Sequence, residues 1–275
     1  MVNVNCNILQ AVDKNLMIAD KIFRSRLMVG TGKYETVQIA KQSIHASGAS
    51  IVTAAIRRLQ INHPFEEKSL FKYLDWNSLW LLPNTAGCTT VEEAVRAASL
   101  GRELCKKIGQ SNNNFIKLEI IPDYKYLLPD PIGTLKAAEY LINKQYTVLP
   151  YIYPDPVLAK QLEELGCSTV MPLGSPIGSG QGLKHLDSIR VIIENAKVPV
   201  IVDAGIGTAS DAVQAMELGA SAVLTNSAIA NAQQPHIMAS SIQLGVQSGR
   251  LAYLAGRMNE LTQAQSSSPI IGISS

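Results

Sequence analysis

Eight apolar runs alternate with eight helical patterns along most of this chain, and the connections between them are short. The runs span 25–32, 50–56, 79–87, 115–121, 147–151, 168–174, 198–205 and 222–226. Helical spacing or helix-start signals follow at 34–46, 66–76, 90–107, 132–143, 155–166, 185–195, 210–218 and 235–254. Continuous apolar runs are typical of parallel strands covered by helices. The pattern predicts an α/β fold, a TIM (β/α)8 barrel.

An open doubly wound sheet is the alternative fold. It normally carries a glycine-rich dinucleotide turn after its first strand, but the segment 30–35 (Gly-Thr-Gly-Lys-Tyr-Glu) lacks the third glycine. A length of 275 residues fits one barrel. We therefore expect an N-terminal leader at 1–17, a single catalytic barrel domain at 18–256 and a flexible C-terminal tail at 257–275.

The composition argues against several classes of protein. A formal net charge of +2 with scattered basic residues disfavours nucleic-acid or membrane-surface binding. Neither a transmembrane stretch nor a targeting leader is recognisable, which predicts a soluble protein. The cysteines form no C-x-x-C pair, as expected of reduced thiols inside a cell: Cys6, Cys88, Cys105 and Cys167. No histidine has ligand spacing, so no metal site is predicted.

The fourth run contains two charges, Lys117 and Glu119, in apolar surroundings. Alternation along a strand places both side chains on one face. A buried lysine either loses its proton or finds a partner, and a deprotonated lysine attacks carbonyl groups. Lys117 is therefore a candidate for imine formation as an uncharged amine, and Glu119 for proton transfer. The alternative is an edge strand whose Lys117 and Glu119 face water.

Small residues follow the last two predicted strands, where barrels of this kind hold phosphate. They lie at 205–207 (Gly-Ile-Gly) and 226–230 (Asn-Ser-Ala-Ile-Ala). Asp203, just before the first turn, either faces the mouth of the barrel or caps a loop. We expect this region to bind a phosphate group.

Other strand ends offer weaker candidates. The segment 178–182 is long and glycine-rich enough for a lid or a partner channel, the alternative being a surface loop. Asn84, Arg57 and Arg58 also follow strands and could meet substrate anions, although solvated arginines are common.

Five segments together resemble thiazole synthase of thiamine biosynthesis, of the bacterial and plastid type. They are 82–87 (Leu-Pro-Asn-Thr-Ala-Gly), 117–120 (Lys-Leu-Glu-Ile), 128–131 (Leu-Pro-Asp-Pro), 170–178 (Val-Met-Pro-Leu-Gly-Ser-Pro-Ile-Gly) and 202–207 (Val-Asp-Ala-Gly-Ile-Gly). The resemblance covers roughly 18–256 and rests on long motifs rather than one short pattern.

This resemblance implies condensation of 1-deoxy-D-xylulose 5-phosphate, dehydroglycine and sulfur from a small carrier protein with a C-terminal thiocarboxylate. Lys117 would form the imine with the ketone, while Glu119 and Asp203 would move protons. The implied phosphate contacts are Gly178, Ala204, Gly205, Asn226 and Ser227. The resemblance further implies no cofactor, an enzyme that supplies dehydroglycine, a homo-oligomer, by analogy a tetramer, and a location in the cytoplasm or plastid stroma.

Two other functions are compatible with the residues. A class I aldolase or phosphosugar isomerase would share the phosphate site, and an aldolase would share the imine lysine. A non-catalytic barrel that binds a phosphometabolite or a protein would keep phosphate binding after Lys117→Ala and would have no measurable chemistry to lose.

Overall fold

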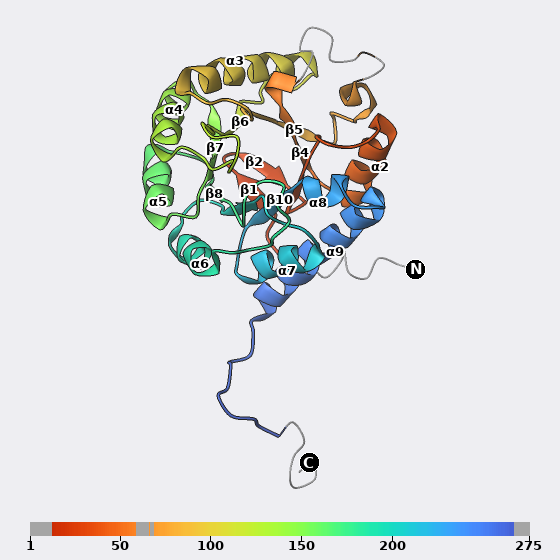
Figure 1. The fold of residues 1–275 in the computed structure, drawn as a ribbon, viewed down its shortest axis with the longest axis vertical. Coiled ribbons are helices and arrows are strands. Elements are labelled where there is room, and N and C mark those ends of the chain that lie inside the picture. The colour runs from red at the N-terminus through yellow and green to blue at the C-terminus, as the bar shows by residue number, and fades with distance from the viewer. Residues whose placement is uncertain (1–12, 59–65, 67–68, 267–275) are drawn as a thin grey trace.

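The computed structural model describes residues 13–58, 66 and 69–266 of the chain. Within them, eight parallel strands form one sheet in the order β8-β7-β6-β5-β4-β3-β10-β9. Parallel bridges from Val170 to Val200 and from Leu173 to Asp203 join β8 to β9. The sheet is thus closed into the predicted (β/α)8 barrel, and the open-sheet alternative is wrong (Figure 1).

The barrel strands are β3 (Leu27–Gly30), β4 (Ile51–Ala55), β5 (Trp80–Asn84), β6 (Phe115–Leu118), β7 (Thr147–Ile152), β8 (Met171–Pro172), β9 (Ile201–Asp203) and β10 (Ala222–Thr225). The outer helices are α2 (Val37–Ser47), α3 (Val91–Lys107), α4 (Pro131–Asn143), α5 (Pro156–Leu165), α6 (Leu186–Asn195), α7 (Ala209–Glu217) and α9 (Pro235–Ala255), and a short helix, α8 (Ser227–Ala230), follows β10. These agree with the predicted elements except after β4. There the prediction of a helix at 66–76 is wrong for the residues that the structure describes. Between β4 and β5 they form only the 3-10 turns η1 (Ile56–Arg58) and η2 (Leu70–Tyr73). Residues 59–65, 67 and 68 lie outside the described part of the chain.

Strand alternation divides the core into layers. Residues such as Val29 and Val202 point outward to the helices, while Met28 and Ile201 point into the barrel. This inner layer fills the end of the barrel at which the strands begin. Because the interior is packed there, the space inside the barrel lies at its opposite end, at the carboxyl ends of the strands.

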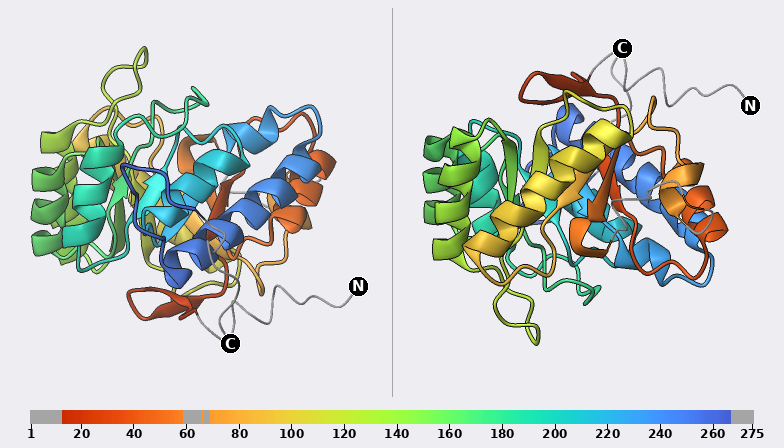
Figure 2. Two further views of the ribbon diagram at one scale, coloured as in Figure 1. Left: turned by 90° about the horizontal axis from the view of Figure 1, so that it is seen from below. Right: turned by 90° about the horizontal axis from the view of Figure 1, so that it is seen from above.

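A two-stranded hairpin, which the sequence did not predict, covers this packed end. Its strands β1 (Leu16–Ile18) and β2 (Lys21–Phe23) are antiparallel. Phe23 packs edge-on against Trp80 and Phe115, with ring centroids 6.5 and 6.1 Å away. Figure 2 shows the hairpin at one end of the barrel, across from the long loops at the other. The hairpin covers this end of the barrel and shields the apolar residues of the barrel interior from water.

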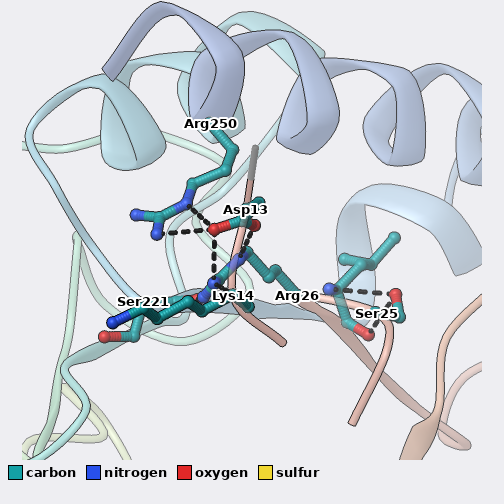
Figure 3. A network of polar contacts seen from close by, with 7 residues as sticks. Asp13, Lys14, Ser25, Arg26, Ser221 and Arg250 are labelled. Atoms are coloured by element: carbon teal, nitrogen blue, oxygen red, sulfur yellow. Dashed lines mark hydrogen bonds and ion pairs between the residues drawn. The ribbon is translucent and has the colours of Figure 1, made fainter. Parts of the chain in front are cut away.

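A cluster of ion pairs fixes the chain just before this hairpin. The Asp13 carboxylate accepts hydrogen bonds from Arg26 at 2.8 and 3.0 Å and from Arg250 of α9 at 3.0 and 2.8 Å (Figure 3). Arg26 also donates to the Ser221 carbonyl oxygen at 2.7 Å. Burial opposes the charge of Asp13, but the two guanidinium groups outweigh it and hold the pKa of Asp13 below its usual value. The cluster ties the N-terminal segment to the last helix.

Candidate functional site

Lys117 is the third residue of β6, and its side chain points into the barrel. Its neighbours Ile116 and Leu118 point outward into the layer beneath the helices. Only 6% of the Lys117 side chain is exposed. The alternative of an edge strand facing water is therefore wrong, because β6 pairs with β5 and β7 on its two sides.

Two carboxylates hold the Lys117 ammonium. Its Nζ lies 3.1 Å from Glu119 Oε1 and 2.6 Å from Asp203 Oδ2. Asp203 ends β9, which is separated from β6 by β7 and β8, so this contact crosses the barrel interior. Lys117 and Asp203 thus form a close ion pair in which both side chains are buried. The structure thus brings together all three predicted catalytic residues.

The charge of Lys117 differs from the sequence-based prediction of a neutral amine. Burial works against the ammonium form, but the charges of Asp203 and then Glu119 outweigh burial and raise the pKa of Lys117 above its ordinary value. The lysine has found partners rather than lost its proton. Before it can attack a carbonyl, the amine has to pass a proton to a neighbouring group.

Asp203 is suited to accept that proton. Burial raises its pKa, the Lys117 charge lowers it and the Glu119 charge raises it again, with a net rise above the ordinary value. A carboxylate with a raised pKa takes up a proton more readily than one in water. The close pair of Lys117 and Asp203 can therefore exchange a proton without a water molecule between them.

A cavity of about 440 Å³ opens beside these three residues at the carboxyl ends of the strands. It is lined by residues from several strand ends, among them Thr53, Asn84, Lys117, Asp203 and Thr225. Asn84 donates to Thr53 Oγ1 at 2.9 Å. Arg57 does not line the cavity; it donates to the Gly87 carbonyl oxygen and pairs with Glu93. The side chain of Arg58 lies outside the described residues.

The predicted phosphate contacts gather at one side of the same cavity: Gly178, Ala204, Gly205, Asn226 and Ser227. Gly178 has a φ of +76° and Gly205 a φ of +80°. Ala204 adopts a left-handed φ of +68°, which is strained for a residue with a Cβ. Strain of this kind clusters at functional sites, because it aims backbone groups at a ligand.

Asn226 occupies space that a glycine of the first barrel strand, Gly30, leaves open. A Cβ on Gly30 would lie 2.7 Å from the Cβ of Asn226, so a larger residue would displace the amide. Asn226 Oδ1 is buried and has no hydrogen-bond partner among the described residues. An amide oxygen accepts hydrogen bonds, so a hydroxyl or N–H group of a ligand would satisfy this atom, whereas a phosphate dianion has no donor to offer it.

Three residues of this site were not predicted as functional. Lys33 lies at the rim, in the loop after β3. Thr53 orients Asn84, and the Tyr151 ring lies 5.6 Å from Lys117 Nζ. Strand alternation could have placed Tyr151 inside the barrel, two residues after the inward-facing Leu149.

A second cavity of about 690 Å³ lies at the other end of the barrel, around Asp13, Arg26 and Arg250. It is larger, but Asp13, Arg26 and Arg250 already pair with one another there. The smaller cavity is the candidate active site, because it alone of the two contains the buried lysine between carboxylates.

A closed barrel with an ion-paired lysine at the carboxyl ends of its strands defines a (β/α)8-barrel enzyme. Residues 17–269 match the family described as thiazole biosynthesis protein ThiG. The chain is 64% identical to thiazole synthase of Porphyra purpurea over 94% of its own length and 93% of that protein's. It is 61% identical to the bifunctional protein ThiO/ThiG of Trichormus variabilis, over 96% of this chain and 40% of that one.

A solved structure agrees with these relatives. A chain from the Amycolatopsis orientalis BexX/CysO complex is 32% identical, with a TM-score of 0.78, and the match covers 91% of this chain and 100% of that one. The chain described here belongs to the ThiG family, and its activity is that of a thiazole synthase in thiamine biosynthesis. The family resemblance seen in the sequence is thereby confirmed, and the relatives give no support to an aldolase, an isomerase or a non-catalytic barrel.

Among the helices that the structure describes, none has both the length and the hydropathy of a membrane-spanning segment. Cys88, Cys105 and Cys167 are buried free thiols, as predicted, and Cys6 lies outside the described residues.

Proposed function

We propose that Lys117 forms an imine with the ketone of 1-deoxy-D-xylulose 5-phosphate in the cavity. The observation that carries the proposal is the buried ammonium held between two carboxylates, 3.1 Å from Glu119 and 2.6 Å from Asp203. This arrangement supplies a nucleophile together with two groups that can take and return protons.

The first step is a proton transfer from Lys117 to Asp203. The neutral amine then adds to the ketone carbon, and the carbonyl oxygen leaves as water while the C=N bond forms. Glu119 and Asp203 next remove and return protons on the adjacent sugar carbons. These tautomerisations expose successive carbons to the sulfur nucleophile and then to the imine of glycine. Because the three side chains are buried, water competes little for these protons.

The sugar phosphate binds at the side of the cavity formed by Gly178, Ala204, Gly205, Asn226 and Ser227. Left-handed backbone at the first three of these residues supports this assignment, since it allows N–H groups to approach an anion closely. The position after β9 and β10 is where barrels of this architecture hold phosphate.

Two protein partners belong to the proposal. The first is a small sulfur carrier with a C-terminal thiocarboxylate, supported by the similarity to a chain solved in the BexX/CysO complex. The carrier tail enters along the 178–182 loop, where Gly178, Gly180 and Gly182 all have positive φ. The second is an enzyme that supplies dehydroglycine, supported by the ThiO/ThiG fusion.

The remaining expectations stay predictions: a homo-oligomer, by analogy a tetramer, and a division into 1–17, 18–256 and 257–275. The same holds for a location in the cytoplasm or the plastid stroma, which agrees with relatives named from Porphyra purpurea and Trichodesmium erythraeum.

Reconstitution tests the proposal as a whole. The protein is incubated with the ketose phosphate, dehydroglycine and a thiocarboxylated carrier, and the thiazole phosphate carboxylate is measured by mass spectrometry. We expect product only when all three substrates are present. Cleavage or isomerisation of the ketose phosphate without a sulfur donor would instead favour an aldolase or isomerase reaction.

A further inference from the structure

Lys33 is a basic residue on strained backbone at the rim of the active-site cavity. It lies in the loop after β3, and its φ of +69° is left-handed. It forms no ion pair with any residue within 13–58, 66 and 69–266. Left-handed backbone is strained for a residue with a Cβ, so the chain keeps Lys33 here at a cost in stability.

The Lys33 ammonium reaches the proposed phosphate contacts. A Cβ on Gly178 would lie 3.3 Å from Lys33 Nζ and 3.7 Å from Ser227 Oγ. The ammonium and the hydroxyl therefore face the same small space beside Gly178. Pairing of β3 with β10 explains the approach, because it places the loop after β3 beside α8, which follows β10.

The charge balance of the cavity leaves a role for a second cation. Among the described residues that line it, the charged ones are Lys33, Lys117, Glu119 and Asp203. Lys117 is neutralised by the two carboxylates and becomes part of the imine, so it is not free to balance a phosphate dianion. Without Lys33, the ligand would add two negative charges to a pocket that already holds two carboxylates.

We propose that Lys33 is the cation that binds the phosphate of the sugar substrate and so selects phosphorylated over free ketose. The inference rests on the proposed binding of a ketose phosphate in this cavity. A lysine suits the task because its compact ammonium acts as a point charge on a phosphate oxygen. Lys33 positions the substrate and takes no part in the bond changes at Lys117.

Two variants separate the ammonium from the backbone. Lys33→Met removes the charge and keeps the length, whereas Lys33→Gly removes the charge and relieves the left-handed strain. Lys41→Met on α2 is the matched control, because Lys41 is an exposed lysine that does not line the cavity. Calorimetric titration with 1-deoxy-D-xylulose 5-phosphate, and with inorganic phosphate as a second probe, gives Kd for each protein.

We expect both Lys33 variants to raise Kd for the ketose phosphate about 10- to 100-fold, the usual effect of losing one charge-assisted contact. At saturating ketose phosphate, their maximal rate of imine formation, measured by borohydride trapping, should stay within about threefold of wild type. Lys41→Met should match wild type in both Kd and this rate. Wild-type affinity in Lys33→Met or Lys33→Gly overturns the inference alone. Wild-type protein that fails to bind the ketose phosphate overturns both the inference and the proposed function.

Discussion

Lys117→Ala is expected to abolish thiazole formation, with a loss of at least about 10³-fold, which corresponds to roughly 4 kcal/mol of transition-state stabilisation. The variant has no amine with which to form the imine, and its methyl side chain cannot move protons. Steady-state product formation in the reconstituted reaction measures the effect. Phosphate binding should persist, because the proposed phosphate contacts lie on other strands and loops.

The control for this variant is Lys117→Arg. Alanine leaves Glu119 and Asp203 as buried carboxylates without a cation, which by itself costs several kcal/mol of folding free energy. Arginine keeps the positive charge, yet a guanidinium stays protonated and does not form the imine. If Lys117→Arg folds as wild type by circular dichroism and still turns over at more than a tenth of the wild-type rate, Lys117 is not the nucleophile.

Asp203→Asn is expected to lower turnover about 10²- to 10⁴-fold, because the amide keeps the shape of the side chain but cannot accept the ammonium proton. Asp203 is the largest of the charges that raise the pKa of Lys117. Its removal should lower that pKa, so the pH at which borohydride-trapped imine reaches half its maximum should move downward. A pH series of trapping with the ketose phosphate alone measures the shift.

Asp187→Asn is the matched control, because Asp187 is fully exposed on α6 and lies 4.0 Å from Arg190. It should leave both the rate and the pH profile unchanged. Glu119→Gln should shift the profile in the same direction as Asp203→Asn but by less, since its charge has the smaller effect on Lys117. An unchanged profile in Asp203→Asn would show that Asp203 does not control the protonation of the amine.

Much of the fold could be predicted because each strand–helix unit has its own sequence pattern. The apolar run around Lys117 predicts a buried strand, and the closed barrel then brings the ends of all strands together. Lys117 and Asp203 could thus be chosen as site residues from two separate strand ends. Their contact across the barrel, at 2.6 Å, needed the closed structure.

Other features of the structure depend on contacts between segments far apart in sequence, so no local sequence pattern predicts them. The hairpin is only three residues in each strand, and it is stabilised by packing of Phe23 on Trp80 and Phe115. The charge of Lys117 was predicted wrongly because it depends on Asp203, 86 residues away in sequence. The prediction of a helix after β4 was wrong: the described residues there form short 3-10 turns. Trp76 Nε1 donates a hydrogen bond to the Phe71 carbonyl oxygen, a contact that the sequence pattern does not reveal.

Reduction with borohydride tests most directly whether one buried amine does the chemistry. The protein is mixed with 1-deoxy-D-xylulose 5-phosphate, treated with borohydride, digested and mapped by mass spectrometry. The account predicts a single modified peptide that carries the reduced ketose phosphate on Lys117. Label on any other lysine, or no label in protein that forms the thiazole product, would contradict it.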